Sequence, residues 1–388
     1  MVTPIRAVHI LRAPVGGLFR HVCDLARAQA ERGIEVGIIC APPGDNTASA
    51  ETLETIEHVC ALGVYRIPMG RLPGPSDIRS AMAIRERCAR LGATILHGHG
   101  AKGGAYARLV ARGIGAKAVY TPHGGSLHYG RNSPVGLIFL TLERLLLKRT
   151  DRLIFVCAFE RDAFIAKVGR PPVPASIVHN GIGPADLEPV RPTGEAADIV
   201  FIGELRMLKG VDVLLRALAG LKRETGATAT IVGAGPDEAH FRELARTLKL
   251  HERVRFAGAL PAREAFGLGR LLVVPSRAES FPYIVLEAAG AGVPLIASRV
   301  GGIPEILTGE FAALMVPPDN AAALSEAIDA ALSDPDGGRQ IADRLAERVA
   351  ERFSIQRMAD DILAVYRGLV APEQATKTAM LADVKPLK

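Results

Sequence analysis

The feature that most restricts the fold of this 388-residue chain is an alternation of short apolar runs with helical patterns. This alternation occurs once in each half of the sequence. In the first half, apolar runs predict strands at residues 7–11, 35–40, 94–97, 118–121, 152–156 and 176–178. Helical patterns separate several of these runs, at residues 18–32, 78–91, 104–112 and 135–149. Strands that alternate with helices in this way predict a parallel α/β sheet.

The alternation stops in a stretch rich in Pro and Gly, residues 180–192, and then begins again. The second set of strands is expected at residues 199–202, 228–232, 254–256, 271–274 and 295–297. A composition with 48% hydrophobic residues can fill two cores of this kind. The fold class is therefore α/β, with two doubly wound Rossmann-like domains that face each other across a cleft.

The domain boundaries follow from these patterns. We expect an N-terminal domain at residues 1–185 and a C-terminal domain at residues 186–352. A terminal helix within residues 353–371 has apolar side chains at helical spacing and is expected to pack back on the N-terminal domain. Residues 372–388 are expected to form a mobile tail.

The net charge and the cysteines indicate which binding partners and which cellular compartment are expected. The net charge is +6, and the first 188 residues carry 23 Lys and Arg against 15 Asp and Glu. A basic half suits anionic lipid headgroups or a lipid-linked pyrophosphate. Nucleic acid is not expected, because the chain has no recognisable binding motif and no Trp. Five cysteines without a C-x-x-C pair predict buried thiols in a cytoplasmic protein.

A secretory signal and a membrane-spanning segment are both not expected. The N-terminus leads directly into a strand, and the longest apolar stretch, residues 134–142, is too short to cross a bilayer. The helix at residues 137–149 ends in Arg144, Lys148 and Arg149. This helix is either an amphipathic core helix or a surface that binds the inner face of the cytoplasmic membrane.

Two carboxylates, Glu279 and Glu287, lie eight positions apart across a predicted turn from strand to helix. Ser280 is predicted to be the N-cap of this helix, with Pro282 in its first turn. The free N–H groups of a first helical turn favour an anion. The segment therefore suits a ligand that combines a phosphate with a polyol.

This segment, Glu279-Ser280-Phe281-Pro282-Tyr283-Ile284-Val285-Leu286-Glu287, closely resembles the E-x7-E region of retaining GT-B glycosyltransferases of family 4, also called glycosyl transferases group 1. The resemblance continues through residues 290–297 and 300–305. It implies a hexosyltransferase that uses a UDP- or GDP-linked sugar and needs no metal or other cofactor. The implied acceptor is a hydroxyl group, on a lipid-linked or polysaccharide molecule of envelope or exopolysaccharide synthesis.

The resemblance also implies roles for residues of the second half. Glu287 binds the ribose hydroxyls, Glu279 contacts the donor sugar, and the helix start at Phe281, Pro282 and Tyr283 binds the diphosphate. The family usually clamps the diphosphate with an Arg and a Lys, and Lys209 fits that pattern. Here Glu204 stands where the Arg is usual, so we expect Arg206 to replace it. Gly235, in the loop at residues 233–237, lies on the nucleotide side.

The first half contributes the remaining expected site residues. Gly16 and Gly17 form a loop that lets the backbone approach the donor, and Arg20 follows on the acceptor side. His123, directly after a strand, resembles the family's active-site histidine. His99 is expected to line the acceptor pocket. His97 and His99 also form a His-x-His pair, but no carboxylate or thiol ligand accompanies it, so no metal is expected.

Two mechanisms and two other functions remain to be weighed. The transfer proceeds either through a glycosyl-enzyme at Glu279 or by front-face transfer, which we favour, with His123 orienting the sugar. A nicotinamide-dependent oxidoreductase needs a glycine fingerprint that residues 13–17 do not supply. A non-catalytic subunit that binds nucleotide sugars is the remaining alternative.

Overall fold

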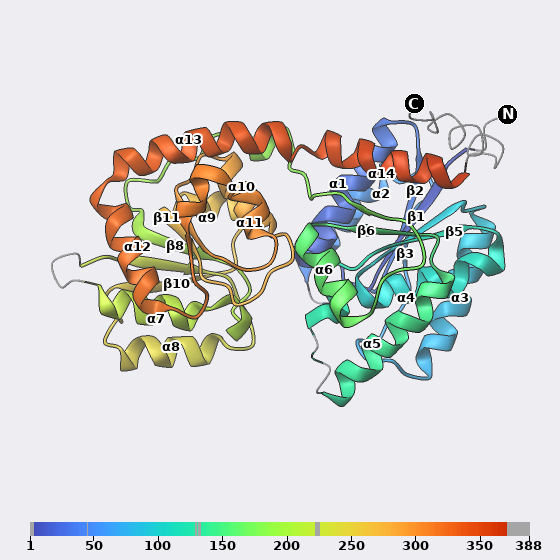
Figure 1. Cartoon of the computed structure of the whole chain (residues 1–388), viewed down its shortest axis with the longest axis horizontal. Helices are drawn as coiled ribbons and strands as arrows, with labels where there is room; N and C mark the ends of the chain where they lie inside the picture. Colours follow the sequence, from blue (N-terminus) through green and yellow to red (C-terminus); the bar gives the residue numbers. More distant parts are fainter. Residues whose placement is uncertain (1–3, 45, 129, 131–132, 222–225, 371–388) are drawn as a thin grey trace, which may run out of the picture. The chain divides into compact units, whose positions relative to one another are not determined.

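The structure is a computed structural model that describes residues 4–44, 46–128, 130, 133–221 and 226–370 (Figure 1). Its contacts divide the chain into two units. Unit 1 consists of the chain up to Val156, residues Arg161–Val178 and the chain from Met358 onward, and unit 2 of Cys157–Glu160 and His179–Arg357. The main division thus lies at Val178, seven residues before the boundary expected from the sequence. The expected mobile tail, residues 372–388, lies outside the described residues.

Unit 1 is built on a seven-stranded sheet in the order β3-β2-β1-β4-β5-β6-β7, in which all pairs are parallel. Most of these strands are continuous apolar runs because helices cover both faces of a parallel sheet. The three-residue strand β3 was not predicted from the sequence. The strands are β1 (Arg6–Leu11), β2 (Glu35–Cys40), β3 (Val64–Arg66), β4 (Ile95–His99), β5 (Lys117–Thr121), β6 (Arg152–Phe155) and β7 (Ala175–Ile177).

The helices of unit 1 include one from the far end of the sequence. Its Tyr366 hydroxyl lies 2.6 Å from His97 Nδ1, and its Asp360 forms an ion pair of 2.6 Å with Arg32. The helices are α1 (Gly16–Glu31), α2 (Thr47–Glu57), α3 (Ser76–Arg90), α4 (Gly100–Val110), α5 (Pro134–Leu146), α6 (Ala158–Lys167) and α14 (Ile355–Val370). The first three residues of α6 and of α14 belong to unit 2.

Unit 2 has a six-stranded parallel sheet in the order β10-β9-β8-β11-β12-β13. The strands are β8 (Ala197–Ile202), β9 (Ala229–Val232), β10 (Val254–Gly258), β11 (Gly269–Val274), β12 (Leu295–Ser298) and β13 (Met315–Val316). The helices are α7 (Val211–Gly220), α8 (Glu238–Thr247), α9 (Ala262–Phe266), α10 (Tyr283–Gly290), α11 (Ile303–Ile306), α12 (Ala321–Ser333) and α13 (Pro335–Arg352).

The predicted pair of parallel α/β sheets is confirmed. In each unit the carboxyl ends of the strands meet at one edge, where open α/β sheets bind ligands. All five cysteines are buried and unpaired. Within the part of the chain that the structure describes, no helix has both the length and the apolar character needed to cross a bilayer.

Candidate functional site

The loops after β8 and β11 meet at the carboxyl edge of the unit 2 sheet. Lys209 Nζ lies 2.6 Å from Glu279 Oε1, and the Ser276 hydroxyl donates to the same oxygen at 2.7 Å. Only 9% of the Glu279 side chain is exposed. The structure therefore brings together a lysine and a carboxylate that the sequence analysis assigned to one donor site.

Arg206 lies on the surface of the same loop. Its Nη1 is 3.6 Å from Glu204 Oε2, and both side chains are about half exposed. The acid at the usual arginine position thus pairs with the arginine that we expect to replace it. Such an exposed pair is weak, at about 0–1 kcal/mol, so an incoming diphosphate can displace Glu204 from Arg206.

Arg277 holds this loop in place through hydrogen bonds. This role was not expected from the sequence. Its guanidinium forms two hydrogen bonds with the buried Asp212, at 2.8 and 2.9 Å, and donates to the carbonyl of Met207. Burial alone raises the pKa of Asp212, but the guanidinium outweighs it and holds that pKa below its usual value. Since 65 residues separate the partners, the only local signal was an arginine next to the predicted strand end. Arg277 fixes the turn that carries Lys209.

The loop at residues 233–237 packs on the loop after β8. A Cβ at Gly233 would lie 1.8 Å from the Gly203 carbonyl oxygen, and one at Gly235 would lie 2.4 Å from that of Leu205. The Asp237 carboxylate accepts a hydrogen bond of 2.7 Å from the Met207 N–H. Close packing of the two loops therefore already requires glycine at position 235, whatever contact it makes with a nucleotide.

Helix α10 begins at Tyr283, two residues later than an N-cap at Ser280 would place its start. The prediction that Ser280 is the N-cap was wrong, because Pro282 occupies that position in an extended conformation and the Ser280 hydroxyl lies 3.2 Å from Glu160 Oε1. No side chain caps α10, so its first N–H groups can bind an anion. Tyr283 is the first helical residue and Glu287 the fifth, and both are mostly buried.

The backbone before α10 is held tightly in place. A Cβ at Gly301 would lie 2.0 Å from the Glu279 carbonyl oxygen, and the Gly302 N–H donates to the Ser280 carbonyl at 2.6 Å. The Asn180 side chain donates to the Phe281 carbonyl at 2.9 Å. The Phe281 ring is buried, so only the backbone of this residue remains for a ligand.

Three histidines of unit 1 form a chain of hydrogen bonds that ends at His123. Gln29 Oε1 lies 2.9 Å from His9 Nε2, His9 Nδ1 lies 2.9 Å from His99 Nε2, and His99 Nδ1 lies 3.1 Å from His123 Nε2. The ring of His21 lies against that of His123, with centroids 4.6 Å apart. His99 and His123 were expected at the site from the sequence, whereas His9 and His21, which come from β1 and α1, were not.

Burial keeps these rings neutral. It lowers the pKa of His9 to about 4 and lowers the pKa of His99 and of His123 well below the ordinary histidine value. His123 also has a positive φ of 51°, unusual for a residue other than glycine, directly after β5. Such strain, about 1–3 kcal/mol, tends to collect at active sites. Both features make His123 the candidate functional residue of the hydrogen-bonded chain.

The same rings offer nitrogen atoms that could surround a cation. Two triads, His9 with His97 and His99, and His21 with His99 and His123, have ligand atoms within 4.8 Å of one another. A metal ion there would have to break the His9–His99 and His99–His123 hydrogen bonds. Neither triad contains a carboxylate to offset the charge of the ion. That the enzyme needs no metal stays a prediction.

The remaining predicted residues of unit 1 lie around the start of α1. Gly16 begins the helix with a positive φ of 67° and open space around it, and Gly17 is also exposed. Arg20 forms an ion pair of 3.2 Å with Asp24 one turn later. The glycines are therefore accessible to a ligand, while Arg20 has an acidic neighbour on its own helix.

A cavity of about 270 Å³ lies at the carboxyl edge of the unit 1 sheet. His99 lines it, as the sequence analysis expected, together with Arg12, Arg71 and Lys102. Lys102 pairs with Asp77 at 2.6 Å. Arg12 and Arg71 have no ion-pair partner among the described residues, which leaves two guanidinium groups for an anionic ligand.

Two family models match the chain. Residues 16–181 match the model described as Glycosyl transferase 4-like domain, and residues 196–334 match the one described as Glycosyl transferases group 1. Among curated relatives, D-inositol 3-phosphate glycosyltransferase 1 from Catenulispora acidiphila is 28% identical over 416 aligned residues, which cover 94% of this chain and 96% of the relative.

Solved structures with the same fold cover nearly the whole chain. Sucrose-phosphate synthase from Thermosynechococcus elongatus has a TM-score of 0.79 at 22% identity and covers 94% of this chain and 99% of its own. Anabaena HepE in complex with UDP and glucose also has a TM-score of 0.79, at 18% identity, with 94% and 100% covered. At these identities the superpositions establish the fold.

Proposed function

Since this chain belongs to the group 1 glycosyltransferases of family 4 and has their GT-B fold, we propose that it moves a hexose from UDP or GDP to a hydroxyl acceptor with retention of configuration. The observation that carries the proposal is the meeting of Lys209 with Glu279 beside the uncapped start of α10. A cation, a sugar-binding carboxylate and the start of a helix without a side-chain cap match the parts of a nucleotide sugar.

Unit 2 holds the donor in this proposal. Lys209, Arg206 and the first N–H groups of α10 bind the diphosphate, whose negative charge grows as the anomeric bond breaks. Glu287, on α10, binds the ribose hydroxyls, and Glu279 binds hydroxyls of the sugar. In the free enzyme Lys209 neutralises Glu279, so the carboxylate is held in place before the donor arrives.

Unit 1 supplies His123, and the chain of histidines determines which of its nitrogens carries the proton. Because an amide oxygen only accepts, Gln29 Oε1 requires the proton of His9 on Nε2. His9 Nδ1 then accepts from His99 Nε2, and His99 Nδ1 accepts from His123 Nε2. His123 Nδ1 is left as an acceptor for a hydroxyl of the donor sugar. Since the ring is neutral, it does not repel the positive charge that develops at the anomeric carbon.

The transfer proceeds at the front face of the sugar. A donor phosphate oxygen takes the proton of the acceptor hydroxyl while the new bond forms on the side from which the diphosphate leaves. In this mechanism Glu279 is not the nucleophile: its Oε1 accepts from both Lys209 and Ser276, which holds the carboxylate in position to bind the sugar. Its role is to fix the sugar against the departing diphosphate.

The acceptor carries a phosphate close to its reacting hydroxyl. The cavity lined by His99 has two guanidinium groups, of Arg12 and Arg71, and guanidinium groups bind phosphate in two-pronged geometry. The relative named for D-inositol 3-phosphate acts on a phosphorylated polyol. A lipid-linked diphosphate of envelope or exopolysaccharide synthesis offers the same chemistry, and we favour it because of the apolar face of α5.

Helix α5 presents apolar side chains to solvent. The buried face of α5 includes Phe139, Leu140 and Glu143, whereas Leu137, Ile138 and Leu145 are exposed. Exposed basic side chains follow directly, at Lys148 and Arg149. An apolar face beside cations suits an anionic membrane surface. The enzyme is therefore proposed to be cytoplasmic and peripheral to the inner face of the cytoplasmic membrane.

Release of nucleoside diphosphate tests the proposed function. Purified enzyme is incubated with UDP- and GDP-linked hexoses, with and without inositol phosphate or a polyprenyl diphosphate sugar as acceptor. We expect acceptor-dependent release with one donor and none with Glu287→Ala, while Glu326→Ala, an exposed change on α12, serves as the control. Tight UDP or GDP binding without turnover of any acceptor would instead identify a non-catalytic subunit.

A further inference from the structure

A second cavity lies in unit 2, away from the loops that carry Lys209, Glu279 and the start of α10. Its volume is about 540 Å³. It is lined by the start of β11, by residues directly before β12, and by parts of α9, α12, α13 and the segment that precedes β8. Since all strands of the sheet are parallel, this cavity lies at the amino edge and the donor loops lie at the carboxyl edge.

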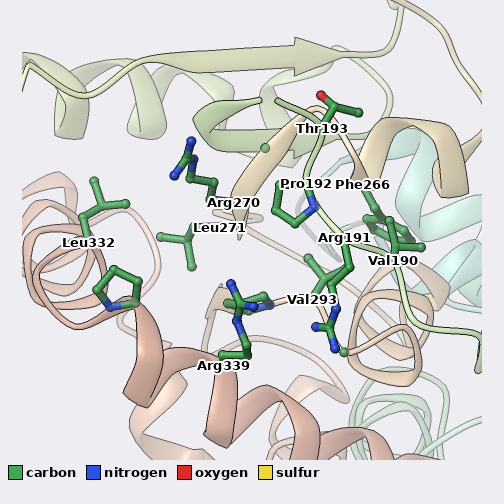
Figure 2. A pocket seen from close by; sticks show the side chains of 14 residues that line it. Val190, Arg191, Pro192, Thr193, Phe266, Arg270, Leu271, Val293, Leu332 and Arg339 are labelled. Atoms are coloured by element: carbon green, nitrogen blue, oxygen red, sulfur yellow. The ribbon is translucent and has the colours of Figure 1, made fainter. Parts of the chain in front are cut away.

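Three arginines from separate elements line this cavity (Figure 2). Arg191 precedes β8, Arg270 is the second residue of β11, and Arg339 lies in the second turn of α13. No Asp or Glu is among the lining residues. None of the three guanidinium groups has an ion-pair partner within the described ranges. The cavity therefore has a concentrated, uncompensated positive charge.

The rest of the lining is apolar. Phe266, Leu271, Val293 and Leu332 contribute side chains to the walls, and Thr193 adds one hydroxyl (Figure 2). Guanidinium groups recognise phosphate oxygens in two-pronged geometry, and apolar walls can contact the rest of such a ligand. A volume of this size falls in the range of small-molecule sites, about 300–1,000 Å³.

We propose that this cavity binds a small phosphomonoester, of the size of a sugar phosphate or a mononucleotide, as a ligand distinct from the donor and the acceptor. The arginines hold the phosphate, and the apolar walls accommodate the sugar or the base. The cavity is separate from the donor loops, because none of its lining residues belongs to them.

Two elements link the cavity to the proposed donor site. Strand β11 begins in the cavity and ends at Val274. The turn after α10, at Gly292, also lines the cavity. Glu279 follows the far end of β11, and Glu287 lies in α10. A ligand in the cavity thus contacts the opposite ends of elements that position both carboxylates.

Isothermal titration calorimetry tests the proposal with AMP, glucose 6-phosphate and inorganic phosphate as probes, and with adenosine and glucose as uncharged counterparts. We expect one of the two esters to bind more tightly than inorganic phosphate, and its uncharged counterpart not to bind. Arg270→Ala and Arg339→Ala should each weaken that binding by at least about tenfold. Arg255→Ala, which removes an exposed arginine from β10 of the same sheet, is the matched control and should bind as the wild type does.

The donor site is the competing explanation for binding of a phosphorylated probe. Binding through the arginine cavity persists in Lys209→Ala and in the presence of saturating UDP, whether or not the enzyme transfers sugar. Loss of the signal in Lys209→Ala, unchanged affinity in Arg270→Ala and Arg339→Ala, or no binding of either ester up to about 10 mM would each overturn the proposal.

Discussion

Lys209 and Glu279, separated by 70 residues in the sequence, form an ion pair with 2.6 Å between Nζ and Oε1. The same carboxylate oxygen accepts from Ser276, and Arg277 holds the turn on which Lys209 lies. The two residues are thus fixed relative to each other by hydrogen bonds from both loops. A diphosphate bound at Lys209, as we propose, would therefore lie beside a carboxylate that these hydrogen bonds already hold in one orientation.

Arg206 is expected to complete the diphosphate clamp. Arg206→Ala should lower kcat/KM by about 10²–10³, because it removes one cation from the developing diphosphate charge. Glu204→Gln should change the rate by only a few fold, because it frees Arg206 from a weak surface pair. Steady-state kinetics with the preferred donor measures both, and a rate for Arg206→Ala close to that of the wild type would show that the clamp uses another residue.

Glu279 is expected to position the sugar and not to form a covalent intermediate. Glu279→Gln retains hydrogen bonding and should lose about a hundredfold in kcat with little change in affinity for UDP. Mass spectrometry of the wild type quenched during turnover should find only unmodified enzyme. A glycosyl group on the peptide that contains Glu279 would establish double displacement instead.

The buried histidines make stability depend on pH. Burial lowers the pKa of His9 to about 4, while an unfolded histidine titrates near 6.5. Below pH 6.5 the unfolded chain therefore binds more protons than the folded one, and the unfolding free energy falls with decreasing pH down to about 4, by up to about 1.4 kcal/mol per pH unit for each such histidine. Stability from this source is fully present above pH 6.5.

Urea unfolding between pH 7.5 and 4.5 measures this dependence. His9→Asn should be less stable at pH 7.5 but should show a shallower fall with acid, because one depressed titration is gone. His251→Asn, at an exposed position, should keep the slope of the wild type. Equal slopes for His9→Asn and the wild type would contradict the role of His9.

The exposed face of α5 predicts binding to anionic vesicles. Wild-type protein should sediment with phosphatidylglycerol liposomes at low salt and less so as salt screens Lys148 and Arg149. The double variant Ile138→Gln with Leu145→Gln should remain largely in the supernatant. Ile78→Gln with Met82→Gln removes two exposed apolar side chains from α3 and should sediment like the wild type. If both double variants sediment equally, α5 is not the binding face.

Substitution of Gly235 is expected to lower the stability of the folded protein even when no nucleotide is bound. Gly235→Ala places a Cβ 2.4 Å from the Leu205 carbonyl oxygen, and the backbone must shift at a cost of about 1–3 kcal/mol. Gly338→Ala, in α13 with open space around it, should instead stabilise the protein by roughly 0.5–1 kcal/mol. Thermal unfolding of the two variants without ligand distinguishes packing from nucleotide contact.

The sequence predicted most strands because each is an apolar run between turn residues, as at Ile38 and Ile39 in β2. It missed β3 and β13, which have three and two residues and too little pattern to detect. It also missed α2, a largely polar helix that Asn46 caps. Short and polar elements acquire their structure from neighbours that are distant in the sequence.

The site residues that could be predicted were likewise those with a local signal in the sequence. Lys209 and Glu279 were found because each directly follows a predicted strand, where ligands bind in such sheets. His9 was missed because a histidine inside an apolar run gives no sign of which side chains it contacts; β1 must first pair with β4 to bring it beside His99. Arg277 and Asp212 likewise become partners only once β8 and β11 are neighbours.

The chain of hydrogen bonds from Gln29 to His123 can run in only two directions. Each neutral ring donates once and accepts once, so the direction of the first hydrogen bond dictates the direction of all the others. Rotation of the Gln29 amide by half a turn would exchange its oxygen for its nitrogen and reverse every bond, leaving all ring positions unchanged. His123 Nδ1 would then offer a donor where it now offers an acceptor, so the orientation of an amide three hydrogen bonds away determines which hydrogen-bonding role His123 presents to a ligand.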